Sequence, residues 1–330
     1  MSTSGHDRRA FFRQLLRGAT RAAEEMESLR RATDDAVRRA TSLGEDAEPA
    51  WHPVAAEPTT HLATLDELRS LCVEVGRETW VDEAVTLARM GFRLTRGGDG
   101  TSWLGGTPRA GSFEWPVWND VELAFLGRIA LDGLPPTALP ESGALLLFFA
   151  VDRAPSGDRP TDTGACRVLH VDDAPFSDEP LYGGMPFAGV TLSGELTLPA
   201  SPATLATDLD ELEAWTDLRE RLAAAQGVEL EETAASYHAL HRLLGHPDTY
   251  AEGMEDDAEL VSRGIDLEDQ PFADSDAEQP SAEGDWTLLV QISNDDDLAL
   301  DLGDAARLFV WIRRDDLEAG RFDRVQAFVR

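Results

Sequence analysis

Two distant parts of this sequence repeat the same order of short elements, and this repeat constrains the fold more than any other feature. Each part has a Gly-x-Pro turn, then an apolar segment that ends near an Ile, and then a second apolar segment. The matched positions, first part before second, are Gly106 and Gly245, Pro108 and Pro247, Ile129 and Ile292, and Phe148 and Phe309. Apolar runs of this length, bounded by turn residues, are typical of buried strands. We therefore expect an α+β fold with two internally related β-rich halves, a pseudo-duplication with flanking helices.

The N-terminal region follows a different pattern. Residues 7–40 repeat apolar or small residues at helical spacing, and we interpret residues 1–43 as one long amphipathic helix. Its narrow, alanine-rich seam must pack on the body of the chain, on a second copy or on another protein, so self-association through this helix stays open. Residues 44–60 contain three prolines and no periodicity, which predicts a linker. The α+β domain then covers residues 61–330, with half one at about 92–200 and half two at about 201–330.

Local patterns predict further helices and strands within this domain. We expect helices at 65–75, with Thr64 as the N-cap, and at 80–90, 207–225 and 229–244. Alternating residues predict strands at 166–171, 189–198 and 322–329.

An acidic insert at residues 251–285 makes half two longer than half one. It contains thirteen acidic residues and a single arginine. This composition predicts a mobile, solvated loop, with docking to a basic partner or loose cation binding as the functional alternatives.

Charge narrows the classes of partner. The chain of 330 residues has a net charge of -33, and all 29 basic residues are arginine. Such an acidic body repels phosphate backbones, so we expect no nucleic-acid partner. Two roles stay open for this charge: attraction of a basic protein partner, or solubility alone. No apolar run is long enough to cross a bilayer, and two widely separated cysteines favour reduced thiols in a cytoplasmic protein.

A histidine cluster is the first candidate site. His238 and His241 would share one helix flank, with His246 in the turn that follows, and this triad is a candidate metal site. Its spacing matches no common zinc motif, and Gly245 has the place of a residue that ends a helix. In the repeat, His246 aligns with Thr107, which favours a structural helix end with a hydrogen-bonded His241.

Two other groups of residues are weaker candidates. The turn after the Ile292 segment is rich in aspartate, and Asp295, Asp297 and Asp304 are candidate ligands for a divalent cation, although the spacing is not that of an EF-hand. A cleft between the halves is a candidate ligand site. Its lining residues would be Trp103, Trp115, His241, His246 and Trp311, against the alternative that these tryptophans pack in the core. The sequence has no nucleophile or phosphate-binding motif, so we predict no catalytic residues and no cofactor.

Five further motifs lie within about residues 101–330: Leu104–Pro108, Ala124–Ile129, His241–Pro247, Leu288–Asp295 and Asp304–Ile312. Together they resemble the YwqG-like family, a bacterial family of unknown function, and the resemblance covers about residues 101–330. It implies an α+β fold with related β-rich halves and a cytoplasmic setting, but no established reaction. A link of the family to toxin–immunity gene neighbourhoods implies a binding role.

Together these observations favour a cytoplasmic, non-catalytic binding protein. One version neutralises a basic protein, such as a toxin, through the acidic surface, where electrostatic attraction would speed association. The alternative is a small-molecule- or metal-dependent enzyme that uses the histidine cluster or the aspartate-rich turn.

Overall fold

The computed structural model divides the chain into two units, Met1–Thr59 and Thr60–Arg330, and only residues of the second are described. The described residues are 62–97, 101–108, 113–172, 176–177, 185–200, 202, 208–227, 240–248, 253–269, 286–303 and 306–330. The predicted helix at 1–43, the linker at 44–60, His238 and Asp304 therefore lie outside the described residues.

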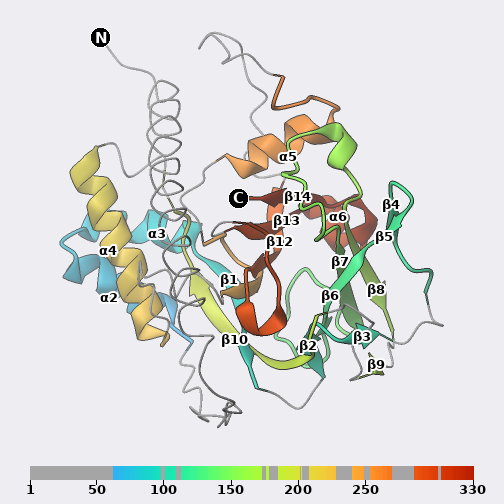
Figure 1. Ribbon diagram of the computed structural model, residues 1–330. Helices are drawn as coiled ribbons and strands as arrows, with labels where there is room; N and C mark the ends of the chain where they lie inside the picture. Colours follow the sequence, from blue (N-terminus) through green and yellow to red (C-terminus); the bar gives the residue numbers. More distant parts are fainter. Residues whose placement is uncertain are drawn as a thin grey trace, which may run out of the picture. The chain divides into compact units, whose positions relative to one another are not determined.

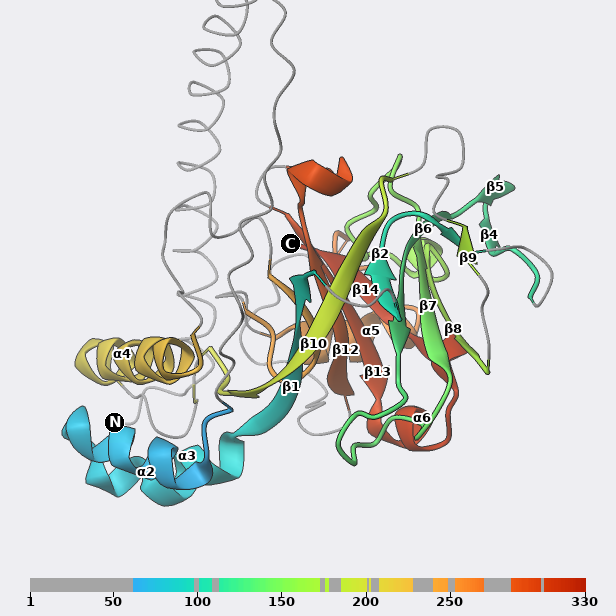
Figure 2. The same cartoon turned by 90° about the horizontal axis from the view of Figure 1, so that it is seen from below.

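A ten-stranded antiparallel sheet dominates the α+β unit (Figures 1 and 2). Its strands, in their order across the sheet, are β14 (Gln326–Val329), β13 (Arg307–Arg313), β12 (Trp286–Ser293), β11 (His241–Leu244), β1 (Arg89–Arg96), β10 (Ala188–Thr197), β2 (Ser102–Leu104), β6 (Ala124–Ala130), β7 (Ala144–Phe149) and β8 (Cys166–Val171). Two short pairs lie outside it, β3 (Thr107–Pro108) with β9 (Phe176–Ser177) and β4 (Val117–Trp118) with β5 (Val121–Glu122).

The central strands β1 and β10 separate two sets of four strands with the same pairing pattern. One set is β2-β6-β7-β8, and the other is β11-β12-β13-β14. In the first set β6 bulges at Leu126 against β7, and in the second β12 bulges at Leu289 against β13. Phe148 lies opposite Phe125 in the first set, and Trp311 lies opposite Leu288 in the second. In register, Phe148 therefore corresponds to Trp311, so the expected match of Phe148 with Phe309 is shifted.

The sheet is nearly closed, because a connecting segment contacts the edge strand β14. The Val329 N–H donates to the Ser156 carbonyl at 3.0 Å, and Arg330 forms an ion pair with Asp158. The largest hydrophobic cluster draws buried residues from both four-strand sets, among them Ile129 and Ile292. This shared core packs the two sets together, since neither could bury its apolar face alone.

A helical layer packs on one end of β10. It consists of α2 (Leu65–Glu74), the 3-10 turn η1 (Glu78–Trp80), α3 (Val81–Leu87) and α4 (Leu209–Ala225). Thr64 and Glu67 form the predicted N-terminal cap of α2, which confirms that helix start. Trp80 and Trp215 meet edge to face in the core of the layer, with ring centroids 5.7 Å apart.

Part of the acidic insert is a packed helix, so the prediction of a mobile loop is wrong there. The helix α5 (Met254–Ser262) buries Met254, Ala258 and Val261 against β12 and β14. These apolar residues recur at helical spacing, which the acidic composition concealed. The remaining helical elements are short: α6 (Arg314–Glu318), η2 (Pro160–Asp162), η4 (Asp296–Leu298) and η5 (Phe322–Arg324).

Two predicted helices also differ from the structure. His241–Leu244, expected as the end of a helix at 229–244, forms strand β11 between β1 and β12. The helix predicted at 80–90 ends at Leu87, and β1 begins at Arg89. In both places pairing with neighbouring strands outweighs a short helical pattern. Among the described residues, no helix is long and apolar enough to span a membrane.

Candidate functional site

His241 is held in the sheet by both ring nitrogens. Its Nδ1 accepts from the Ser293 N–H at 3.2 Å, so the proton lies on Nε2, which is 3.2 Å from the Asp295 carboxylate. The first strand set has the same type of bond, because the Ala130 N–H donates to Ser102 Oγ at 2.9 Å. His241 therefore performs a structural task in a position where the other set uses serine.

The aspartate-rich turn is organised by its own hydrogen bonds. Asp295 Oδ1 accepts from the Asp297 N–H at 3.0 Å, and Arg96 pairs with both Asp295 and Asp297. Burial opposes ionisation of Asp295, but hydrogen bonds from His241 and Arg96 lower its pKa to about 2. The structure thus places Asp295 beside His241 of β11, while Asp297 of the same turn faces Arg96. Even so, the described residues contain no cluster of three or more potential ligands that could hold a metal ion.

His246 lies apart from His241, in the turn after β11. Its backbone N–H donates to Thr197 Oγ1 at 2.9 Å, and Nε2 donates to the Leu87 carbonyl at 2.7 Å. Burial lowers the pKa of His246 to about 3, and the nearby charges of Arg89, Arg242 and Arg219 add to the effect. The ring is therefore neutral at physiological pH and is not available as a general acid.

The tryptophans proposed to line a cleft lie in separate hydrophobic clusters. Trp103 and Trp115 belong to a cluster built around Phe148, where Trp115 Nε1 donates to the Leu123 carbonyl at 2.9 Å. Trp311 is fully buried in a different cluster, under α5. The structure does not bring these three side chains together with the two histidines.

The two cysteines are also buried. Desolvation raises the pKa of Cys72, and it raises the pKa of Cys166 to about 12. Thiols in such surroundings stay protonated and are poor nucleophiles.

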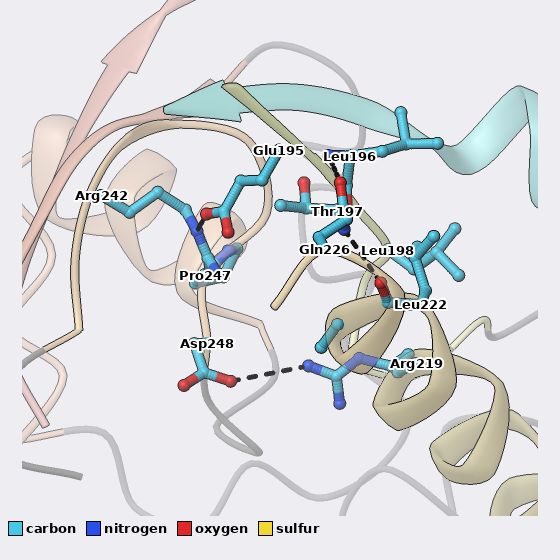
Figure 3. A pocket seen from close by; sticks show the side chains of 11 residues that line it. Glu195, Leu196, Thr197, Leu198, Arg219, Leu222, Gln226, Arg242, Pro247 and Asp248 are labelled. Atoms are coloured by element: carbon cyan, nitrogen blue, oxygen red, sulfur yellow. Dashed lines mark hydrogen bonds and ion pairs between the residues drawn. The ribbon is translucent and has the colours of Figure 1, made fainter. Parts of the chain in front are cut away.

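A charged pocket, whose residues share no recognisable sequence motif, lies where β10, α4 and the turn after β11 meet (Figure 3). Its enclosed space is small, about 30 Å³, and the pocket opens to solvent. We refer to it as the β10–α4 pocket. Its lining residues are Glu195, Leu196, Thr197, Leu198, Arg219, Leu222, Ala223, Gln226, Arg242, Pro247 and Asp248.

The inner end of this pocket is a buried ion pair. Arg242 Nε donates to the Glu195 carboxylate, and Nη1 donates to the His246 carbonyl at 2.8 Å. Burial alone would lower the pKa of Arg242, but the carboxylates of Glu195 and Asp248 raise it, so the guanidinium stays charged.

The outer end carries a second group of charges. Asp248 Oδ2 is 3.1 Å from Arg307 Nη1, and Oδ1 is 3.9 Å from Arg219 Nη2 (Figure 3). Asp248 is thus fixed mainly by Arg307, while Arg219 from α4 lies at a longer distance across the opening.

Gln226 joins α4 to β10 and shapes the wall between these two groups. Its amide oxygen accepts from the Leu196 N–H at 2.6 Å, and its amide nitrogen donates to the Leu196 and Leu222 carbonyls. Arg93 Nη2 donates to the Gln226 carbonyl at 3.2 Å and so caps the C-terminal end of α4.

A sequence signal for this pocket existed but was ambiguous. Glu195 lies within an alternating strand pattern, and Arg242 lies between two histidines in a segment that resembled a helix. The partners are far apart in the chain, so only the strand pairing brings them together.

Comparison with known proteins shows the family but no activity. The model of a domain of unknown function, DUF1963, matches residues 102–329, which is more than half of the chain. No curated protein matches the sequence. The chain therefore belongs to the DUF1963 family, whose function is not known.

Proposed function

We propose that this chain is a non-catalytic binding protein that recognises a basic protein partner through its helical layer. The observation that carries the proposal is the charge of this layer. Residues 62–88 and 208–227 together contain twelve acidic residues and four arginines. A surface of one sign steers an oppositely charged partner and speeds association, and salt weakens the effect.

Exposed apolar side chains on the same layer support a protein partner. Leu65 and Val73 of α2 are 42% and 52% exposed, and Leu209 at the start of α4 is 71% exposed. Large apolar side chains among charged residues are typical of protein interfaces, where apolar contacts supply affinity and charges supply specificity.

The chemistry of the histidines supports binding over catalysis. Both ring nitrogens of His241 are engaged, and His246 is neutral and hydrogen-bonded to the backbone. An enzyme that used either residue for proton transfer would first have to break these contacts.

The test is capture of partners by the immobilised full-length protein from a lysate of the source cells, at low and high salt. A neutralised variant should lose the partner, and it carries substitutions on the exposed surface of the helical layer: Glu74→Gln, Glu78→Gln, Glu213→Gln and Glu220→Gln. The expected result is a basic protein that is captured at low salt and released at high salt.

A matched control keeps the total charge equal to that of the neutralised variant. It carries four substitutions at exposed acids in the β4–β5 and β6–β7 regions: Asp120→Asn, Glu122→Gln, Asp132→Asn and Glu141→Gln. If net charge alone governs binding, both variants lose the partner equally. The proposal fails in that case, and also if no basic partner is captured.

We also propose that the two four-strand sets arose by internal duplication. Their matching bulges and pairing, and the shared Gly-x-Pro turns, support this origin. A YwqG-like identity within the family and a cytoplasmic location are parts of the same proposal, supported by the quoted motifs and by two buried free cysteines.

A further inference from the structure

We propose that the helical layer is a lid that opens from the sheet as one cooperative unit, and that Gln226 is the latch that holds it closed. The inference does not depend on the proposed protein partner. It rests on the separate core of the layer, on the hydrogen bonds of one buried side chain, and on the looser packing beside that side chain.

The layer has a hydrophobic core of its own. Its buried residues form a cluster separate from the large cluster that the two strand sets share. All but two of them come from the helices, from η1 and from Ala63 just before α2; the exceptions are Leu196 at the end of β10 and Leu198 directly after that strand. Separation at this one strand end would leave both cores largely intact, which is the condition for a local opening that spares the rest of the fold.

Gln226 joins the layer to the sheet through both polar atoms of its side chain. The residue directly follows α4 and is 2% exposed. Its Oε1 accepts from the N–H groups of Ala63 at 3.3 Å and Leu196 at 2.6 Å. Its Nε2 donates to the carbonyls of Leu196 at 3.0 Å and Leu222 at 3.1 Å. One side chain therefore ties together the start of the layer, the end of β10 and the last turn of α4, and a primary amide has the donors and acceptors to do so.

The backbone beside this latch is also held. Arg93 of β1 donates from Nη2 to the Gln226 carbonyl at 3.2 Å and from Nη1 to the Gly227 carbonyl at 3.5 Å. Breaking one of these contacts leaves a buried polar group without its partner, which costs more than a hydrogen bond normally contributes to stability. The contacts at the end of α4 should therefore break together when water enters, and not one after another.

Packing between α4 and the sheet is looser away from Gln226. The β10–α4 pocket leaves about 30 Å³ unfilled between them, and side chains beside an unfilled space lose van der Waals contacts. Figure 3 shows the pair of Arg219 and Asp248 apart from Gln226. Their closest atoms are 3.9 Å apart, which is too long for a hydrogen bond. Closure of the layer should therefore depend on Gln226 more than on this ion pair.

The pivot of the lid lies where α3 runs into β1. The helix ends at Leu87 and the strand begins at Arg89, so the chain itself keeps the layer attached there. His246 Nε2 donates to the Leu87 carbonyl at 2.7 Å and fixes this connection to the turn after β11. An opening that breaks the Gln226 contacts can therefore proceed while the layer stays tethered to the sheet.

The experiment is native-state hydrogen exchange of the full-length protein, followed by mass spectrometry at low urea concentrations. In the wild-type protein we expect the amides of α2, α3 and α4 to share one free energy of opening and one urea dependence, because a cooperative opening exposes them together. They should exchange at least about tenfold faster than the amides of β6, β12 and β13. This measurement needs no variant.

Two variants locate the latch. Gln226→Met keeps the length of the side chain and removes its hydrogen bonds, and it should speed exchange in all three helices by the same factor of at least about ten. The matched control is Gln291→Met in β12. Gln291 is also a buried glutamine, but its Oε1 accepts from the Asp248 N–H and its Nε2 donates to the Leu240 carbonyl. It should speed exchange around β11 and β12 and leave the three helices at the wild-type rate.

Each result decides for or against the lid. Common, faster exchange of the three helices in the wild-type protein, increased by Gln226→Met and not by Gln291→Met, supports it. The inference is overturned if the helices exchange with different free energies, or only together with the sheet. It is also overturned if folded Gln226→Met leaves the helices unchanged, speeds the sheet equally, or acts no more strongly on the helices than Gln291→Met.

Discussion

The turns that follow β2 and β11 have the same backbone conformation but opposite surroundings. Gly105 and Gly106 in the first turn both have a φ of +64°, and Leu244 and Gly245 in the second have +58° and +78°. The first turn is closed by the chain at Met185–Phe187, whose Met185 carbonyl accepts from the Gly106 N–H at 2.9 Å. The second turn leads into the charged pocket through Pro247 and Asp248.

The strand residues shortly before these turns also differ: the one before the first turn is apolar and the one before the second is charged. Trp103 lies opposite Arg128 on β6, and Arg242 lies in the same register opposite Gln291 on β12. Trp103 packs in an aromatic cluster, whereas Arg242 pairs with Glu195. The two strand sets therefore share a backbone pattern but differ in side-chain chemistry. Apolar side chains fill the space beside the first turn, whereas a buried ion pair lies beside the second.

Gly105→Ala should cause the largest loss of stability among the variants that test this comparison. The new Cβ would overlap the backbone carbonyl of Pro186, and the left-handed φ adds strain. We expect a loss of about 5 kcal/mol in the free energy of unfolding, measured by chemical denaturation. Gly245→Ala, which meets the Thr197 side chain and the Gly91 Cα, should cost about 2 kcal/mol. Equal losses would mean that the first turn is not closed more tightly than the second.

Arg242→Met tests the charged side of the comparison. It leaves Glu195 buried without its partner, and we expect a loss of about 4 kcal/mol in the free energy of unfolding. The double variant Glu195→Leu with Arg242→Met removes both charges and should recover most of this loss. Thermal and urea denaturation of the two variants gives the coupling. A double variant as unstable as the single one would show that the pair is not the source of the effect.

The sequence could predict the strand pattern better than the site. The apolar segments at Leu123–Leu131 and Leu288–Ser293 are buried strands because they are apolar, short and bounded by turns, and that signal is local. The start of α2 was predictable because its signal is also local: Thr64 and Glu67, three residues apart, cap the helix through hydrogen bonds to each other's backbone. The segment at His241–Leu244 was not, because four residues carry too little periodicity to separate a strand from a helix end.

The pocket could not be predicted because its determinants are distant in the chain. Glu195 meets Arg242 only because β1 lies between β10 and β11, and Asp248 meets Arg307 only through the order of β11, β12 and β13. The histidines attracted attention by their number, but hydrogen bonds to Ser293, Asp295 and Leu87 show structural tasks. Residue type alone drew the prediction to His241, whereas the ion pair of Arg242 with Glu195 depends on the strand register.

Low pH should destabilise the protein through protonation of His246 in the turn after β11. The corresponding residue in the turn after β2 is Thr107, which does not titrate. The folded-state pKa of about 3 lies below the ordinary histidine value of 6.5, so the unfolded chain binds a proton that the folded chain does not. Stability therefore falls as the pH falls from 6.5 toward 3, by about 3 kcal/mol at about pH 4. Denaturation curves of His246→Gln should lack this slope, while Thr107→Ser should keep it. An unchanged slope in His246→Gln would assign the acid sensitivity to other groups.

The smallest expected change in stability concerns Asp295 in the loop after β12. Asp132 has the corresponding position in the loop after β6. Asp295 is buried between His241 and Arg96, whereas Asp132 is exposed. The pKa of Asp295, lowered from 3.8 to about 2, means that its stabilisation is complete above pH 3.8 and is lost as the pH falls through 2. Asp295→Asn should therefore cost about 2 kcal/mol at neutral pH, and little at pH 2, where the wild-type carboxyl is about half protonated and has lost most of its stabilising effect. Asp132→Asn should change stability by less than about 0.5 kcal/mol at either pH. Urea denaturation of the two variants at both pH values decides the point: equal effects would show that the second loop does not depend on its buried carboxylate, and the contrast between the sets would then be confined to Arg242 and His246.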